Sequence, residues 1–164
     1  MYRRRDTILG MGVLYTYFVA RSADVAGAVL DQPSGPGGPD GMELVDGIMP
    51  VPLTGIDPPV MLGQLQSLLT GVSWQAIFER GTYEIVAATD DNAVTVMSMP
   101  AAFQRALATA SQGALEAVCE PWSEIEEFGG GVDPRDLENI VSDLAELART
   151  AESTNRRMYC WVCL

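Results

Sequence analysis

The sequence predicts an α+β fold, a single domain in which a mixed β-sheet is covered by helices. Helical patterns of unequal length follow one another without a repeated strand–helix–strand cadence, and an apolar, strand-like segment lies toward each end of the chain. With 164 residues, 48% of them hydrophobic, the chain can bury one ordinary core. We therefore assign residues 11–164 to one α+β domain and residues 1–10 to an N-terminal extension. Whether Met1 or Met11 is the natural start stays open.

The first apolar segment, residues 11–20, follows a run of arginines and superficially resembles a signal peptide. Its content of aromatic and β-branched residues favours a buried strand instead. No other stretch approaches the roughly 18 apolar residues of a transmembrane helix, so we expect no membrane association. Three cysteines, an odd number, favour reduced thiols. These features predict a cytoplasmic protein.

The boundaries of the next elements are predicted from helix-capping residues and from glycines and prolines that end helices. Ser22 is placed to cap a short helix over residues 23–30. The segment from Ser34 to Gly41 is so rich in glycine and proline that we predict a flexible surface connector, and residues 42–53 predict short extended pieces. Asp57, followed by two prolines, begins a helix that ends at Gly71 and whose leucines predict a core face. These leucines are Leu62, Leu65, Leu68 and Leu69.

The second half of the chain begins with a further helical turn over residues 74–78. Residues 83–88 and 93–98 then form a predicted hairpin around an Asp-Asp-Asn turn. A helix is expected from Met99-Pro100 to near Gly113, and another from residue 114 until Pro121 stops it.

The strongest pattern is an amphipathic helix that Asp133 caps and Pro134 opens. Its apolar stripe predicts ordinary core packing. The stripe consists of Leu137, Ile140, Val141, Leu144, Leu147 and Ala148. A terminal strand from Met158 to Leu164 follows this helix.

Charge composition excludes whole classes of function. All ten basic residues are arginines, lysine and histidine are absent, and the net charge is −12. Catalysis by Ser-His-Asp or Cys-His groups, histidine metal ligation and a lysine Schiff base therefore lack their side chains. Nucleic-acid binding is disfavoured because an acidic surface repels a polyanion. Two alternatives stay open: the charge only keeps the protein soluble, or it matches a basic protein partner.

The densest acidic segment runs from Glu116 to Glu146, with ten acids and only Arg135 as a base. Its centre predicts the candidate binding residues, three glutamates flanked by two aromatics. These are Trp122, Glu124, Glu126, Glu127 and Phe128. Three readings are open: solvated and capping acids, a protein-binding surface, or acid/base or metal chemistry in an enclosed pocket.

Cys160 and Cys163 have the CxxC spacing of redox and metal sites. In a strand, residues three apart point to opposite faces, so the two sulfurs are not expected to meet. With Cys119 as the one further thiol, the four-ligand pattern of structural zinc is incomplete. We therefore predict strand and core cysteines, with no metal or cofactor. Redox and metal roles remain the open alternatives.

Ile56-Asp57, followed by Leu65-Gln-Ser-Leu-Leu-Thr-Gly71, resembles the "LD…LHFLLTG" motif of the YfbM-like family, bacterial proteins of unknown function. Met11-Gly12, Glu120-Pro-Trp122 and the closing helix and strand are similar to family landmarks in order. The resemblance implies a compact α+β fold and no established reaction. Gln66 stands where the family usually has histidine and Leu62 where it usually has tryptophan, so the resemblance implies no activity that depends on that histidine or tryptophan.

These features together favour a binding or interaction module over an enzyme. Its concrete form is an acidic inhibitor of a basic partner, such as an immunity protein, with Trp122 as the anchor of the surface. The alternative is a small-molecule-binding protein or enzyme that uses carboxylates and tyrosines in a pocket near Gln66, with Tyr15 and Tyr17. Convergence of Gln66, Trp122 and Glu124 on one cleft would favour that alternative. The oligomeric state is left open.

Overall fold

A single five-stranded sheet runs through the computed structural model, which describes residues 13–164 of the chain. The predicted N-terminal extension lies outside these residues. The strands are β1 (Leu14–Ala20), β2 (Val51–Thr54), β3 (Ile85–Ala88), β4 (Val94–Ser98) and β5 (Arg157–Cys163). Their order across the sheet is β2-β1-β5-β4-β3, so the strand nearest the C-terminus lies at the centre. The α+β fold and the hairpin of β3 and β4 are confirmed.

Every pairing in the described sheet is antiparallel, whereas we expected a mixed sheet. The single sequence shows the strands but not their directions, which depend on where the long helical connections return the chain. In β5, successive residues point to opposite faces and both faces are buried. This strand is consequently apolar at nearly every position, as expected of a strand covered on both sides.

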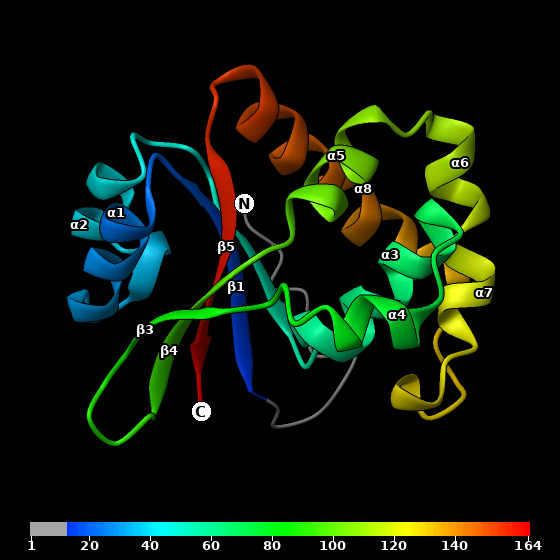
Figure 1. Cartoon of the computed structure of the whole chain (residues 1–164), viewed down its shortest axis with the longest axis horizontal. Helices are drawn as coiled ribbons and strands as arrows, with labels where there is room; N and C mark the ends of the chain where they lie inside the picture. The colour runs from blue at the N-terminus through cyan, green and yellow to red at the C-terminus, as the bar shows by residue number, and fades with distance from the viewer. Residues whose placement is uncertain (1–12) are drawn as a thin grey trace.

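Helices cover both faces of the sheet, which gives a three-layer arrangement (Figure 1). The smaller layer holds α1 (Ala23–Ala28), the 3₁₀ turns η1 (Val29–Asp31) and η2 (Gly35–Gly37), and α2 (Pro39–Leu44). The larger layer begins with a π-helical turn, η3 (Pro58–Leu62), and continues through α3 (Gly63–Thr70), α4 (Trp74–Glu79), α5 (Ala101–Thr109), α6 (Gln112–Ala117), α7 (Cys119–Ser123), the 3₁₀ turn η4 (Glu126–Phe128) and α8 (Pro134–Ser153).

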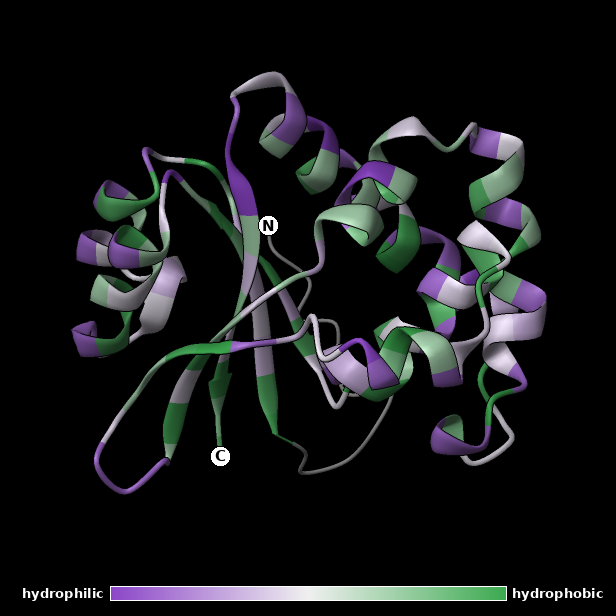
Figure 2. Cartoon of the chain, viewed as in Figure 1, coloured by the Kyte–Doolittle hydropathy of each residue, from purple (hydrophilic) through white to green (hydrophobic). Residues whose placement is uncertain are grey.

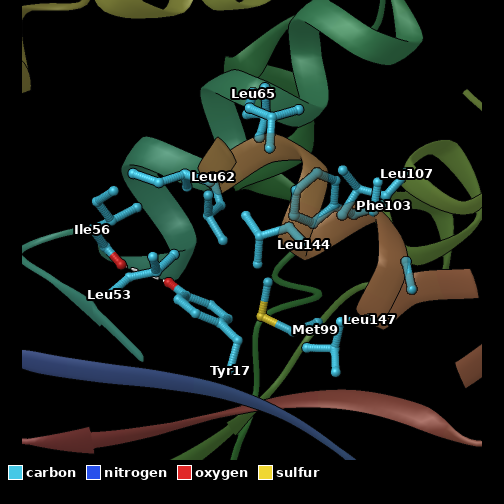
Figure 3. Close-up of a cluster of buried hydrophobic side chains, with 14 of the residues drawn as sticks. Tyr17, Leu53, Ile56, Leu62, Leu65, Met99, Phe103, Leu107, Leu144 and Leu147 are labelled. Carbon is cyan, nitrogen blue, oxygen red and sulfur yellow. Dashed lines mark hydrogen bonds between the residues drawn. The ribbon is translucent and has the colours of Figure 1, made fainter. Parts of the chain in front are cut away.

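Two hydrophobic clusters correspond to the two faces of the sheet. The larger one joins Tyr17 and Val19 of β1 to the helices α3, α5, α7 and α8, and the smaller one joins Phe18 to α1 and Trp161. Figure 3 shows Tyr17 pointing into the larger cluster beside Met99, Phe103 and Leu144. Figure 2 shows hydrophobic residues along the central strands and mixed hydrophilic and hydrophobic bands on the helices around them. The core is thus divided by the sheet into two unequal parts.

The capped helices agree with the prediction. The side chain of Ser22 accepts a hydrogen bond from the Val25 amide, that of Asp57 from the Val60 amide, and that of Asp133 from the Arg135 amide. Gly71 ends α3 in the left-handed conformation, with φ of 74°. The predicted apolar stripe of α8 is buried along its length. Among the described residues, no helix is long and apolar enough to cross a membrane.

The glycine- and proline-rich segment is not a flexible connector, and that prediction is wrong. Residues 35–37 form η2, residues 39–44 form α2, and Gly35, Pro36 and Gly41 are buried. A Cβ at Gly35 would lie 2.7 Å from the Trp161 ring, and one at Gly41 would overlap the backbone of Gly35. Glycine is required here because two backbone segments and an indole ring come together without room for side chains. Tight packing, not flexibility, explains the composition.

Pro121 does not end a helix as expected. It is the third residue of α7, where the N–H that proline lacks would have no partner within the helix. The preceding helix ends at residue 117 instead, and the new turn begins at Cys119. Trp122 is thereby turned toward the core.

Candidate functional site

Eight exposed carboxylates gather on α6, α7, η4 and the first turns of α8, and we call them the acidic surface. Its members are Glu116, Glu120, Glu124, Glu126, Glu127, Asp133, Asp136 and Glu138. The predicted binding residues Glu124, Glu126 and Glu127 are among them. None of the eight is in an ion pair within the part of the chain that the structure describes. The acidic surface therefore presents its charge to solvent.

Hydrogen bonds hold part of the acidic surface in place. Glu127 accepts from the side-chain amide of Gln64 on α3 at 2.9 Å, and Glu116 accepts from Gln112 one turn earlier on α6 at 3.0 Å. Asp133 caps α8, as predicted, and Asp136 lies in the first turn of that helix, where the helix dipole favours negative charge. These are structural tasks that leave the remaining carboxylate oxygens available to a partner.

Trp122 and Phe128 are not surface residues, so the assignment of Trp122 as a binding anchor is corrected. Trp122 is 0% exposed and donates a hydrogen bond from its indole N–H to the Met61 carbonyl at 2.9 Å. The Phe128 ring, also buried, lies edge-on to it with ring centroids 5.2 Å apart. Both rings are part of the core beneath the elements that carry the acidic surface. The apolar spacing that indicates this burial was available in the sequence: Leu115, Val118, Cys119 and Trp122, all buried.

The helices α3 and α4 carry exposed apolar side chains that sequence reasoning missed. Phe78 on α4 is 54% exposed, and its ring centroid lies 5.4 Å from that of the half-buried Trp74. Leu68 on α3, predicted as core, is 39% exposed. It lies one turn after Gln64, which bonds to Glu127 of the acidic surface. Because α3 packs against both α4 and α7, the helices that carry Phe78 and Leu68 are neighbours of an element of the acidic surface.

Two of the predicted pocket residues, Tyr17 and Gln66, are buried in the larger layer, where their side chains form hydrogen bonds within the protein. The Tyr17 hydroxyl donates to the Ile56 carbonyl at 2.6 Å (Figure 3), and the Tyr83 hydroxyl donates to the Gln66 side-chain oxygen at 3.2 Å. Tyr15 is half-buried on the same strand as Tyr17. Sequence reasoning missed Tyr83, because its spacing resembled an ordinary strand residue. The side chains of Tyr17 and Gln66 therefore join separate segments of the chain through hydrogen bonds.

Burial raises the pKa of Tyr17, Tyr83 and Tyr15 above the ordinary value of 10.0, and the nearby carboxylate of Asp57 raises all three further. A phenol in this state keeps its proton at neutral pH, so it donates hydrogen bonds and does not act as a base. Gln66, Trp122 and Glu124 were expected to line one cleft if the protein is an enzyme, and they do not. Gln66 and Trp122 are buried and internally bonded, whereas Glu124 is exposed.

The raised tyrosine pKa values predict alkaline unfolding. Below pH 10 these phenols are protonated in both the folded and the unfolded chain. Above pH 10 the unfolded chain loses these protons while the folded chain keeps them, so the free energy of unfolding falls as pH rises. We expect the ultraviolet titration of tyrosinate to show a late fraction that appears together with the loss of circular dichroism. Replacing Tyr83 by phenylalanine should weaken this alkaline sensitivity. An unchanged pH profile in that variant would contradict the assignment.

The cysteine pair of β5 has the geometry that the sequence predicted. Cys160 packs in the larger cluster and Cys163 against the smaller one, on opposite faces of the sheet. Burial raises the pKa of the Cys160 thiol well above its ordinary value, and it raises that of Cys119 as well. Thiols in this state are poor nucleophiles. Cys160 and Cys163 cannot meet as a redox pair in this fold.

Comparison with known proteins adds no assignment. No family model, curated protein or solved structure matches the chain. The resemblance to the YfbM-like family therefore stays a prediction from short motifs. The residues themselves must support any function.

Proposed function

We propose that this chain is a protein-binding module that binds a basic partner through the acidic surface. The observation that carries the proposal is a set of eight exposed carboxylates that make no ion pair among the described residues, on elements next to the helices that carry the exposed Phe78 and Leu68. Protein interfaces commonly combine an apolar, aromatic centre with a polar rim. Complementary charge accelerates encounter with the correct partner and disfavours wrong ones. In this proposal Phe78 takes the anchoring role first assigned to Trp122.

The concrete form that we propose is an inhibitor that covers the basic site of its partner, as an immunity protein blocks a toxin. The rigid support beneath the surface favours this role, because Trp122, Phe128 and the Gln64–Glu127 bond fix its shape before binding. A preorganised surface loses less conformational entropy on association. We also propose the cytoplasm as its compartment, since three free cysteines without a disulfide suit a reducing environment.

The test is capture from host cells with the full chain as bait, followed by mass spectrometry. We expect a basic protein whose association weakens as salt rises, because salt screens exposed charges. Replacing Glu124, Glu126 and Glu127 together by glutamine should weaken binding roughly tenfold, from about 0.5 kcal/mol for each charge. Replacing Phe78 by alanine should accelerate dissociation.

The matched control replaces three exposed acids of the smaller layer, Asp24, Asp40 and Glu43, by their amides. This variant carries the same change in net charge but leaves the acidic surface intact, so its affinity should stay close to that of the parent. Equal weakening in both triple variants would show that only net charge matters. Binding that ignores salt, or the capture of no partner, would count against the proposal.

The alternative of a small-molecule site near Gln66 has less support. Tyr17 and Gln66 are already bonded within the protein, to the Ile56 carbonyl and the Tyr83 hydroxyl. A ligand there would have to displace these bonds, which costs the free energy of leaving buried polar groups unpaired. We therefore prefer the protein-binding function.

A further inference from the structure

An open hollow of about 220 Å³ lies where the start of α5, the end of α8 and the start of β5 meet. Figure 2 shows the start of β5 as strongly hydrophilic at this place. The polar residues that line the hollow are Gln104, Arg105, Glu152, Asn155, Arg156 and Arg157. Nothing in the proposed protein-binding function uses them. The hollow contacts the C-terminal end of α8, whereas the acidic surface lies at its N-terminal end, about 30 Å away for a helix of 20 residues.

The hollow concentrates positive charge in a chain of net charge −12. Three of the ten arginines line it, against the single carboxylate of Glu152. Among the described residues, Asp46 is the acid that forms an ion pair with one of these arginines: it lies 3.2 Å from Arg156 and is shared with Arg21 at 2.7 Å. A local excess of positive charge therefore remains.

The three guanidinium groups differ in what they are free to bind. Arg105 is exposed and, among the described residues, its side chain makes no hydrogen bond or ion pair. Arg157 donates one bond, to the Met99 carbonyl at 2.9 Å, which leaves its other N–H groups available. Arg156 is held by Asp46 with its side chain 16% exposed. Arg105 and Arg157 can thus bind a ligand, whereas Arg156 is held in place by its ion pair with Asp46.

Gln104 builds the floor of the hollow. It is 3% exposed, and its amide nitrogen donates to Glu152 and to the Arg156 carbonyl, both at 3.0 Å. Its oxygen accepts from the Met158 amide at 2.9 Å. These bonds tie α5 to the turn that Asn155 makes in a left-handed conformation, with φ of 54°. The turn places Arg156 and Arg157 beside α5 in a preformed arrangement.

The start of α5 adds to the positive potential. Its N-cap residue is Pro100, which offers no side-chain cap, and Ala101 of the first turn lines the hollow. Unpaired amide groups at a helix start favour an anion. This feature supplements the arginines, which alone define the site.

We propose that this hollow binds a phosphate-type oxyanion, free or as the phosphate group of a small molecule. Guanidinium groups bind such an anion through paired, charge-assisted hydrogen bonds. The size of the hollow, below the 300 Å³ at which pockets for larger ligands begin, suits a small group. The open wall leaves room for an organic group beyond the phosphate.

The experiment titrates inorganic phosphate into the full chain at constant ionic strength and follows calorimetric heat and the thermal midpoint. Phosphate should raise the midpoint as its concentration passes the dissociation constant, with a stabilisation that grows logarithmically with concentration. Replacing Arg105 by alanine should weaken phosphate binding about tenfold, because one charge-assisted interaction is lost. The fold should survive, since the Arg105 side chain has no bond within the described protein. Far-ultraviolet circular dichroism checks this directly.

The control replaces Arg80, an exposed arginine at the end of α4, by alanine and should bind phosphate like the parent. A second titration, with phenyl phosphate, distinguishes the sources: tighter binding than phosphate indicates a small organic phosphate, and equal binding indicates the free ion. Acetate binding as tight as phosphate, or equal losses in the Arg80 and Arg105 variants, would overturn the proposal. No heat and no shift in the parent would overturn it too. None of these outcomes involves a basic protein, so they leave the acidic surface to its own test.

Discussion

Replacing Trp122 by alanine is expected to lower the free energy of unfolding by about 3 to 5 kcal/mol. The indole ring is completely buried among Leu115, Cys119 and the helices above the sheet, so its removal leaves a large cavity. The substitution also removes the hydrogen bond to the Met61 carbonyl and the edge-on contact with Phe128. Chemical denaturation followed by tryptophan fluorescence and circular dichroism measures the change.

Two variants separate the sources of this loss. Trp122→Phe keeps most of the ring but leaves the Met61 carbonyl without its donor, so we expect a loss of about 1 to 3 kcal/mol. Phe78→Ala removes a smaller aromatic ring from an exposed position and should cost much less. If Trp122→Ala were no more costly than Phe78→Ala, Trp122 would not be the core residue described above.

Gly41 is expected to tolerate no side chain at all. A Cβ there would overlap the Gly35 carbonyl, which is backbone and cannot swing aside. Gly41→Ala should therefore force the η2 and α2 segments apart and cost about 3 kcal/mol or more. The smaller hydrophobic cluster should loosen as a result, because Trp161 packs on the same backbone at Gly35. The unfolding midpoint in urea measures the loss.

The matched control makes the same substitution where space is open. Gly113 lies in α6, and a Cβ there would meet nothing within 4 Å. Gly113→Ala should stabilise the protein by about 0.5 to 1 kcal/mol, because alanine restricts the unfolded chain and favours helix. Equal effects at the two glycines would contradict the close approach of Gly41 to Gly35.

Local signals predicted most of the fold. The caps at Ser22, Asp57 and Asp133 and the stripe of α8 depend on residues close in sequence, and all of them agree with the structure. The errors concern long-range packing. A glycine-rich segment looks flexible until Trp161, far along the chain, is placed against it. The directions of the strands likewise depend on connections that no local pattern specifies.

The candidate site was predictable to the extent that it depends on charge. The glutamates at positions 124, 126 and 127 are exposed, as an acidic run in a short-helix region suggests. Trp122 was misplaced because a proline beside it was read as a helix stop. The links between Tyr83 and Gln66 and between Gln64 and Glu127 join separate elements, and only the folded chain brings them together.

The central place of β5 has a consequence for how the chain folds. Within the described sheet, the pair β1–β2 is hydrogen-bonded to the hairpin β3–β4 through β5 alone, and Tyr17 in β1 pairs with Cys160 in β5. Two-stranded pieces are marginal alone, so each half gains its stability when the last strand arrives. Until then, β1 and β4 each present an unpaired edge that another chain could join. A nascent chain is therefore exposed to misassembly until β5 has docked, and contacts of such long sequence separation form slowly.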